Sequence, residues 1–278
     1  MQWLQTDGTA EEMVTAVNYR SGACLGDDAS QQAQMGEILF RSPNLFNGQA
    51  AKARLTCHSC HVDGGDNPYF HFPSISGAAG TADVSNSFFS ASGSNGAFDP
   101  VPIPDLSKSG KVSRTEPMVL ESFLEVLIVN EFAGDTPTKA VLKSLAAFTR
   151  ELATCDEVEP SRPVALDKHI VIARNAMRFA KELYDNGDQK TAAIMIGTAR
   201  DTYGLIHERF ANEEHRKLRK DLERLGARLE ALQLPIKADE WNRTYAELSE
   251  ASLILSQSLQ KSEPRSFYEA EVLRSALQ

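Results

Sequence analysis

In the second half of the chain, apolar residues recur at intervals of four and three. Such intervals place apolar side chains on one narrow face of a helix. The stripes predict four helices, which cover residues 166–184, 192–210, 218–232 and 241–259. Asn186-Gly187 and Pro235 are typical helix ends, and a fifth, short helix is expected over about 265–276. Four helices on short connections predict an antiparallel bundle.

The first half has a different pattern, with three helical segments around a long irregular one. Apolar positions predict helices over 30–41, 119–132 and 137–153. Residues 62–117 are rich in Gly, Ser, Asp, Asn and Pro. A loop of this length is uncommon inside a compact domain, and we expect a large apolar cofactor to organise it. No segment alternates between apolar and polar residues for long enough to predict a strand. The expected fold class is therefore all-α.

A change in charge separates the two halves. Residues 1–157 carry 19 acidic and 10 basic residues, whereas 158–278 carry 19 of each. Two prolines and three acids within 156–163 predict an exposed linker. We therefore predict two domains, 1–157 with a core of about 30–155, and 158–278. The net charge of −9 argues against nucleic acid or an anionic membrane surface as a partner, and no apolar run is long enough to predict a transmembrane segment.

Cys57-His58-Ser59-Cys60-His61 is a CxxCH sequence, the attachment motif of c-type haem. The spacing lets two thiols reach the two vinyl groups of one porphyrin, while His61 follows as the proximal iron ligand. His58 is expected at the surface. Zinc would require a further cysteine or histidine pair at a matching spacing, and a redox dithiol would normally lie at a strand–helix junction. The motif therefore predicts one covalently bound haem c.

Residues flanking the motif resemble those of class I-type cytochrome c domains. Gly36-x-x-x-Phe40 resembles the amino-terminal helix of that fold, where glycine allows close helix approach, and Leu145-x-x-Phe148 resembles the carboxy-terminal helix that crosses it. The resemblance also implies that the carbonyl of Pro73, 12 residues after His61, holds the proximal imidazole.

A narrower resemblance concerns the distal side of the haem. Thr115-Glu116-Pro117-Met118, followed by the helical segment 120–126, resembles the distal-ligand segment of bacterial di-haem cytochrome c peroxidases. Met118 is therefore the expected sixth ligand. His71, in an aromatic and proline-rich segment, is the alternative, and an open or water-bound iron is a third possibility. The peroxidases use two haems, whereas this chain has one CxxCH.

The two remaining cysteines, Cys24 and Cys155, flank the expected haem domain. Covalent haem is attached outside the bacterial inner membrane, which predicts a periplasmic or extracytoplasmic protein. An oxidising compartment favours a Cys24–Cys155 disulfide, and the alternative is two free buried thiols. No short apolar run follows a basic start, so we expect no leader peptide in this chain and interpret it as a mature form or as one with a new initiator methionine.

Together these features predict a mono-haem cytochrome that carries electrons to or from a protein partner, cycling between Fe(III) and Fe(II). The acidic haem domain favours a partner with a basic docking face, or a place in a multi-subunit complex. The helical bundle is expected to serve docking or assembly, or simply to shield the haem. The alternative function is a peroxidase-like haem enzyme, or a haem subunit of a larger redox complex, with an open iron site.

Overall fold

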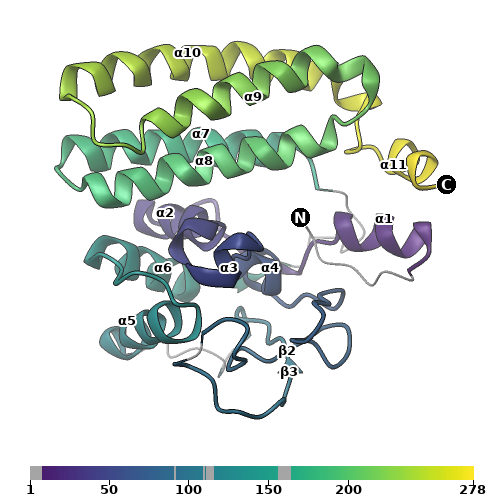
Figure 1. The fold of residues 1–278 in the computed structure, drawn as a ribbon, viewed down its shortest axis with the longest axis vertical. Helices are drawn as coiled ribbons and strands as arrows, with labels where there is room; N and C mark the ends of the chain where they lie inside the picture. Colours follow the sequence, from purple (N-terminus) through teal and green to yellow (C-terminus); the bar gives the residue numbers. More distant parts are fainter. Residues whose placement is uncertain (1–7, 91, 109, 111–115, 156–163) are drawn as a thin grey trace. The chain divides into compact units, whose positions relative to one another are not determined.

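The computed structural model describes residues 8–278 except 91, 109, 111–115 and 156–163, and describes only the backbone of Pro117 and Met118. Most described residues are helical and the strands are short (Figure 1), which confirms the expected all-α class. The chain divides into two compact units, Met1–Arg162 and Pro163–Gln278, and each has a buried apolar core of its own.

Six α-helices are described in the first unit. They are α1 (Ala10–Asn18), α2 (Gln31–Phe40), α3 (Gly48–Lys52), α4 (Cys57–Cys60), α5 (Pro117–Val126) and α6 (Lys139–Glu151). A π-helical turn, Leu127–Glu131, continues α5. The helices expected over 30–41, 119–132 and 137–153 are therefore present, whereas α1 and α3 were not predicted.

Helices α2 and α6 cross in close contact near Gly36. A Cβ atom at Gly36 would overlap the backbone carbonyl of Ser144 and would lie 2.7 Å from Cβ of Phe148. Phe40, one turn further along α2, packs on Phe148 with ring centroids 5.0 Å apart. Only glycine permits this approach, so the close packing expected at Gly36 is present in the structure.

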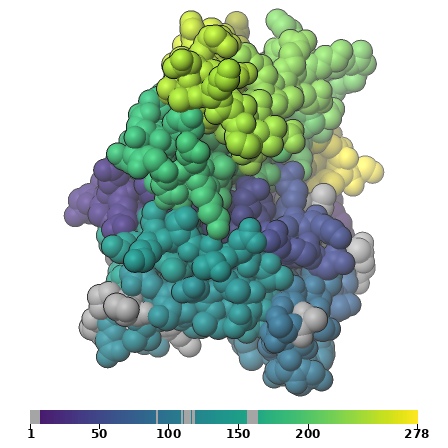
Figure 2. All heavy atoms as spheres, turned by 60° about the vertical axis from the view of Figure 1, so that its left-hand side comes forward, coloured from purple at the N-terminus to yellow at the C-terminus, as the bar shows by residue number. Residues whose placement is uncertain are grey.

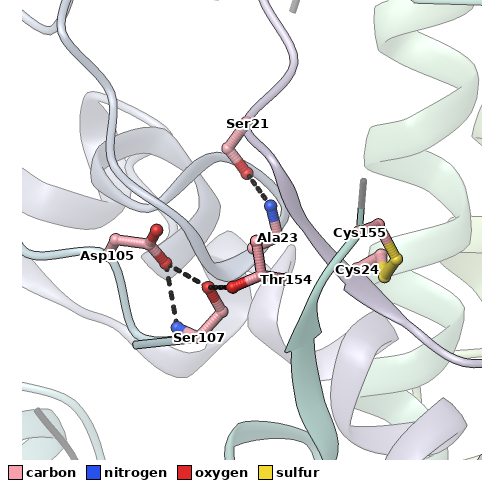
Figure 3. The surroundings of a disulfide bond; sticks show 7 residues. All are labelled: Ser21, Ala23, Cys24, Asp105, Ser107, Thr154 and Cys155. Atoms are coloured by element: carbon pink, nitrogen blue, oxygen red, sulfur yellow. Dashed lines mark hydrogen bonds between the residues drawn. A yellow bond between two sulfur atoms is a disulfide. The ribbon is translucent and has the colours of Figure 1, made fainter. Parts of the chain in front are cut away.

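A disulfide and a pair of short strands join the two ends of the first unit (Figure 3). Strand β1 (Ala23–Leu25) pairs antiparallel with β4 (Leu152–Thr154), with Cys24 opposite Ala153. Cys24 is bonded to Cys155, and their Cα atoms are 5.9 Å apart. The predicted disulfide is therefore formed. The strands were not predicted because three residues are too few to show an alternating pattern.

The described part of 62–117 has little regular secondary structure, but a strand pair and buried apolar side chains fix it. Strands β2 (Thr81–Ala82) and β3 (Val101–Pro102) form one antiparallel pair. The buried apolar side chains of the segment include Phe70, Ile75 and Phe89. The polypeptide thus organises part of this segment with its own core residues.

The second unit is a four-helix bundle. Its long helices are α7 (Leu166–Asp185), α8 (Gln189–Arg209), α9 (Arg216–Ala231) and α10 (Ala238–Ser262), followed by the short α11 (Ala270–Leu277). Each long helix packs on the next in sequence, and α10 closes the bundle against α7. In Figure 2 the atoms of these helices are the green to yellow spheres. The predicted helical bundle is confirmed, and no helix in the described residues is long and apolar enough to cross a membrane.

The best-defined part of the bundle core is an aromatic stack at Trp241, which is 2% exposed. The Trp241 ring lies parallel to Tyr184 with centroids 3.9 Å apart and to Tyr245 with centroids 5.3 Å apart. The indole Nε1–H donates to the carbonyl of Leu232 at 3.1 Å. This hydrogen bond satisfies the one polar atom of the buried indole.

Candidate haem-attachment site

The CxxCH sequence forms a single helical turn, α4, that is fixed by its own flanking residues. Thr56 and Ser59 make a reciprocal capping box, in which each backbone N–H donates to the other hydroxyl at 3.0 and 3.1 Å. The His61 N–H donates to the carbonyl of Cys57 at 2.8 Å and closes the turn. A hydroxyl residue followed three positions later by a second capping side chain is a readable signal. The usual second residue is Glu or Gln, so Thr56 and Ser59 were not predicted to form a cap.

Cys57 and Cys60 lie at the first and last positions of α4, and neither forms a disulfide. Burial raises the pKa of each thiol to about 12, and the neighbouring Cys57 adds to the shift at Cys60. Redox-active dithiols have a lowered thiol pKa, so the surroundings here do not favour that chemistry. Within the described ranges there is no cluster of three or more His, Cys, Asp or Glu side chains arranged to hold a metal ion.

The imidazole of His61 is oriented by one backbone carbonyl. Its Nδ1 lies 3.0 Å from the carbonyl oxygen of Pro104, so Nδ1 donates and Nε2 carries the lone pair that a metal requires. Burial lowers the pKa of His61, although the carbonyls of Pro104 and Gly65 act in the opposite direction. A lowered pKa favours the neutral imidazole, which is the form that coordinates iron.

The carbonyl that holds His61 belongs to Pro104, whereas the sequence resemblance implied Pro73. Pro73 is exposed. The chain returning from β3 passes beside α4 instead, because the Ile103 N–H donates to Gly80 and the Leu106 N–H donates to Gly64, both at 3.0 Å. Pro104 is 43 residues from His61, and no local spacing rule reveals a contact across that separation.

The segment after Pro104 is tied to β4 beside the disulfide (Figure 3). Ser107 donates to Asp105 through both its backbone N–H and its hydroxyl, at 2.9 and 2.6 Å. The Ser107 and Thr154 hydroxyl oxygens are 3.3 Å apart. The chain that supplies the proximal carbonyl is thus linked by polar contacts to the strand that precedes Cys155.

A cluster of charged side chains encloses the other side of α4. Arg41 Nη2 donates to Asp63 Oδ1 at 2.5 Å, and Arg41 Nη1 lies 2.9 Å from His58 Nε2. The Asp63 backbone N–H donates to His58 Nδ1 at 2.9 Å. His58 is only partly exposed, and these contacts hold it within the cluster. The sequence predicted only a surface residue and none of these contacts.

The amino-terminal segment packs on the turn that follows His61. The Ser21 hydroxyl donates to the carbonyl of Val62 at 2.6 Å, and the Tyr19 hydroxyl donates to Asp66 at 2.9 Å. A Cβ atom at Gly65 would collide with the Ser21 side chain. Burial, together with the Asp66 carboxylate, raises the pKa of Tyr19. Sequence analysis did not find this contact because it joins distant segments.

The two expected distal ligands differ in how the structure describes them. Met118 lies in the first turn of α5, but its side chain falls outside the described residues. Thr115, which belongs to the same motif, also falls outside them. His71 is partly exposed and precedes Phe72, whose ring packs on Phe88 with centroids 5.0 Å apart. Both ligand assignments stay predictions.

The donor set around α4 fits a covalently attached haem c. Two unlinked thiols occupy the ends of one turn, and an imidazole with its Nδ1–H already engaged follows directly. No protein-family model matches the chain, and no curated protein and no solved structure is significantly similar to it.

Proposed function

We propose that the chain is a mono-haem c-type cytochrome that carries electrons to or from a protein partner. The observation that carries this proposal is the arrangement of Cys57, Cys60 and His61. The two thiols occupy one capped turn, and the imidazole Nδ1–H is held by the carbonyl of Pro104 at 3.0 Å. This arrangement supplies both thioether positions and one axial ligand from five consecutive residues.

Each residue has a defined role in this proposal. Cys57 and Cys60 form the thioether links, and His61 is the proximal ligand. Met118 is the distal ligand, with His71 as the alternative. When bound, haem c supplies the Fe(III)/Fe(II) couple, and a methionine ligand suits electron transfer because it closes the iron and raises the potential. Pro104 takes the supporting role first assigned to Pro73.

The compartment and the partner follow from other parts of the chain. The Cys24–Cys155 disulfide supports an oxidising compartment, and hence a periplasmic or extracytoplasmic protein. The excess negative charge of residues 1–157 favours a partner with a basic docking face. We assign the bundle to docking or assembly, because every residue proposed to hold the haem lies in the first unit.

The experiment is to produce the chain in the bacterial periplasm with the haem-attachment machinery and to record its spectra. We expect haem to remain on the polypeptide in denaturing electrophoresis, and a methionine–iron charge-transfer band in the oxidised form. The double variant Cys57→Ser/Cys60→Ser should lose stable haem. The matched double variant Cys24→Ser/Cys155→Ser, which removes the same number of thiols, should keep it.

Two results would count against the carrier function in different ways. Haem that dissociates from the denatured wild-type chain would contradict covalent attachment at Cys57 and Cys60. A high-spin oxidised spectrum with rapid reaction toward peroxide would instead favour the peroxidase-like enzyme, with an open iron site, over the electron carrier.

A further inference from the structure

Arg41 brings a positive charge into the interior of the first unit. It caps the carboxyl end of α2, and its side chain is only 11% exposed. Its guanidinium contacts Asp63 at 2.5 Å, His58 at 2.9 Å and Glu37 at 3.4 Å. A buried charge is costly unless it is paired and hydrogen-bonded. Two of the groups that compensate the charge of Arg41, His58 and Asp63, belong to the proposed haem-attachment turn or directly follow it.

Two partners of Arg41 stand on either side of the proposed iron ligand. His58 lies between the two cysteines, and Asp63 is two residues after His61. The Asp63 N–H also donates to His58 Nδ1 at 2.9 Å. Arg41, His58 and Asp63 therefore contact one another, and two of them flank Cys60 and His61 in the sequence.

The backbone of Asp63 needs this support. Its φ of 53° lies in the left-handed region, which is unfavourable for a residue with a side chain. Such conformations persist where the surroundings fix them. Arg41 donates to the Asp63 carboxylate, and His58 accepts from the Asp63 N–H. These two contacts stabilise the left-handed conformation of Asp63 directly after α4.

Asp63, two residues after His61, carries a largely buried charge that is paired with Arg41. The side chain of Asp63 is 10% exposed, and Arg20 Nε lies 4.0 Å from its second oxygen. Charges act more strongly in the interior than in water because the local dielectric is lower. We propose that the Arg41–Asp63 pair positions the attachment turn and sets the reduction potential of the haem. This inference rests on the proposed function.

The two members of the pair should act with opposite sign. An oxidised centre carries one more positive charge than a reduced one, so a nearby cation favours the reduced form. Arg41→Gln should therefore lower the midpoint potential, and Asp63→Asn should raise it. The double variant should lie closer to the wild type than either single variant. A purely structural role would shift both single variants in the same direction, because each loosens the same turn.

The test is a spectroelectrochemical titration of the intact holoprotein and its variants at one pH and ionic strength. Arg178→Gln is the matched control, since it removes the same charge from an ion pair with Glu182 at 2.8 Å in the second unit. We expect opposite shifts for Arg41→Gln and Asp63→Asn, and none for Arg178→Gln. Shifts in the same direction, or no shift in either variant, would overturn the inference.

A second variant and a mass measurement keep the result interpretable. Arg41→Lys retains the charge, so its potential should stay closer to the wild type than that of Asp63→Asn. This comparison decides the inference even if Arg41→Gln fails to accumulate, and an Asp63→Asn potential at or below the wild type contradicts it. Intact masses report haem content separately. A wild type without covalent haem refutes the proposed function, whereas one haem per chain with unchanged potentials refutes only the role of the pair.

Discussion

The two units of this chain differ in the contacts that stabilise each of them internally. In the second unit, each of α7, α8 and α9 packs on the helix that follows it, while α10 packs on α7 and His169 contacts Tyr268, 99 residues away. In the first unit, the contacts beside α4 and the disulfide join separate segments: Arg41 to Asp63, His61 to Pro104 and Cys24 to Cys155, separated by 22, 43 and 131 residues. Distant contacts require entropically costly loop closure. The bundle should therefore fold without haem or disulfide, whereas the first unit depends on its cross-links.

The largest effect is expected for Trp241→Ala in the bundle. Truncating a large buried aromatic residue costs about 3–5 kcal/mol, and this change also removes the stack with Tyr184 and Tyr245. Denaturant unfolding followed by far-ultraviolet circular dichroism should show the loss. The haem absorption of the first unit should stay unchanged, and Trp241→Phe should cost less. A changed haem spectrum in Trp241→Ala would contradict the independence of the two units.

The next largest effect should come from breaking the disulfide with Cys24→Ser/Cys155→Ser. Removing a native disulfide typically costs about 2–5 kcal/mol, and here it also frees the β1–β4 pair. We expect the unfolding transition of the first unit, followed by haem absorption, to move to lower denaturant. The helical signal of the bundle should unfold as in the wild type. An equal shift of both unfolding transitions to lower denaturant would contradict the claim that only the first unit depends on the disulfide.

Gly36→Ala should destabilise the first unit through overpacking at the α2–α6 crossing. The added Cβ would overlap the Ser144 carbonyl, and inserting a group into a close-packed core typically costs about 1–3 kcal/mol. Gly226→Ala is the matched control in α9, where the new Cβ would meet nothing closer than 3.9 Å. That control should be neutral or stabilising by up to about 1 kcal/mol. Chemical denaturation of both variants measures the difference, and equal effects would contradict the packing described at Gly36.

The smallest expected effect is a pH dependence of the bundle caused by Tyr203. Burial raises the pKa of Tyr203 to about 12. Below pH 10 the phenol is protonated in both the folded and unfolded states, whereas above it the unfolded state ionises first. Tyr203 should therefore make the bundle less stable as pH rises from about 10 to 12. Denaturant titrations at several pH values should show a weaker decline for Tyr203→Phe, and parallel declines would contradict the assignment.

Sequence reasoning worked where the structure depends on local periodicity and local chemistry. The four stripes that begin at Leu166 predict the bundle, and Gly187, with φ of 83°, ends its first helix as expected. The close approach at Gly36 was expected from the family resemblance, and the Cys24–Cys155 disulfide from the position of the two cysteines at the ends of the expected domain.

The parts that were missed depend on tertiary contacts between distant segments. The carbonyl of Pro104 reaches His61 only because β3 pairs with β2 and returns the chain past α4. Arg41 and Asp63 carry no sequence signal that marks them as partners. The short strands β1 and β4 are stabilised by each other and by the disulfide, so propensity over three residues could not predict them.

The central claim is that the turn formed by Cys57, Cys60 and His61 carries one covalent haem. The most direct measurement is the intact mass, under denaturing conditions, of the protein produced in the bacterial periplasm with the haem-attachment machinery. We predict a mass that exceeds that of the polypeptide by one haem for the wild type, and by none for Cys57→Ser/Cys60→Ser. A wild-type mass equal to the bare chain, or an excess of two haems, would contradict the account.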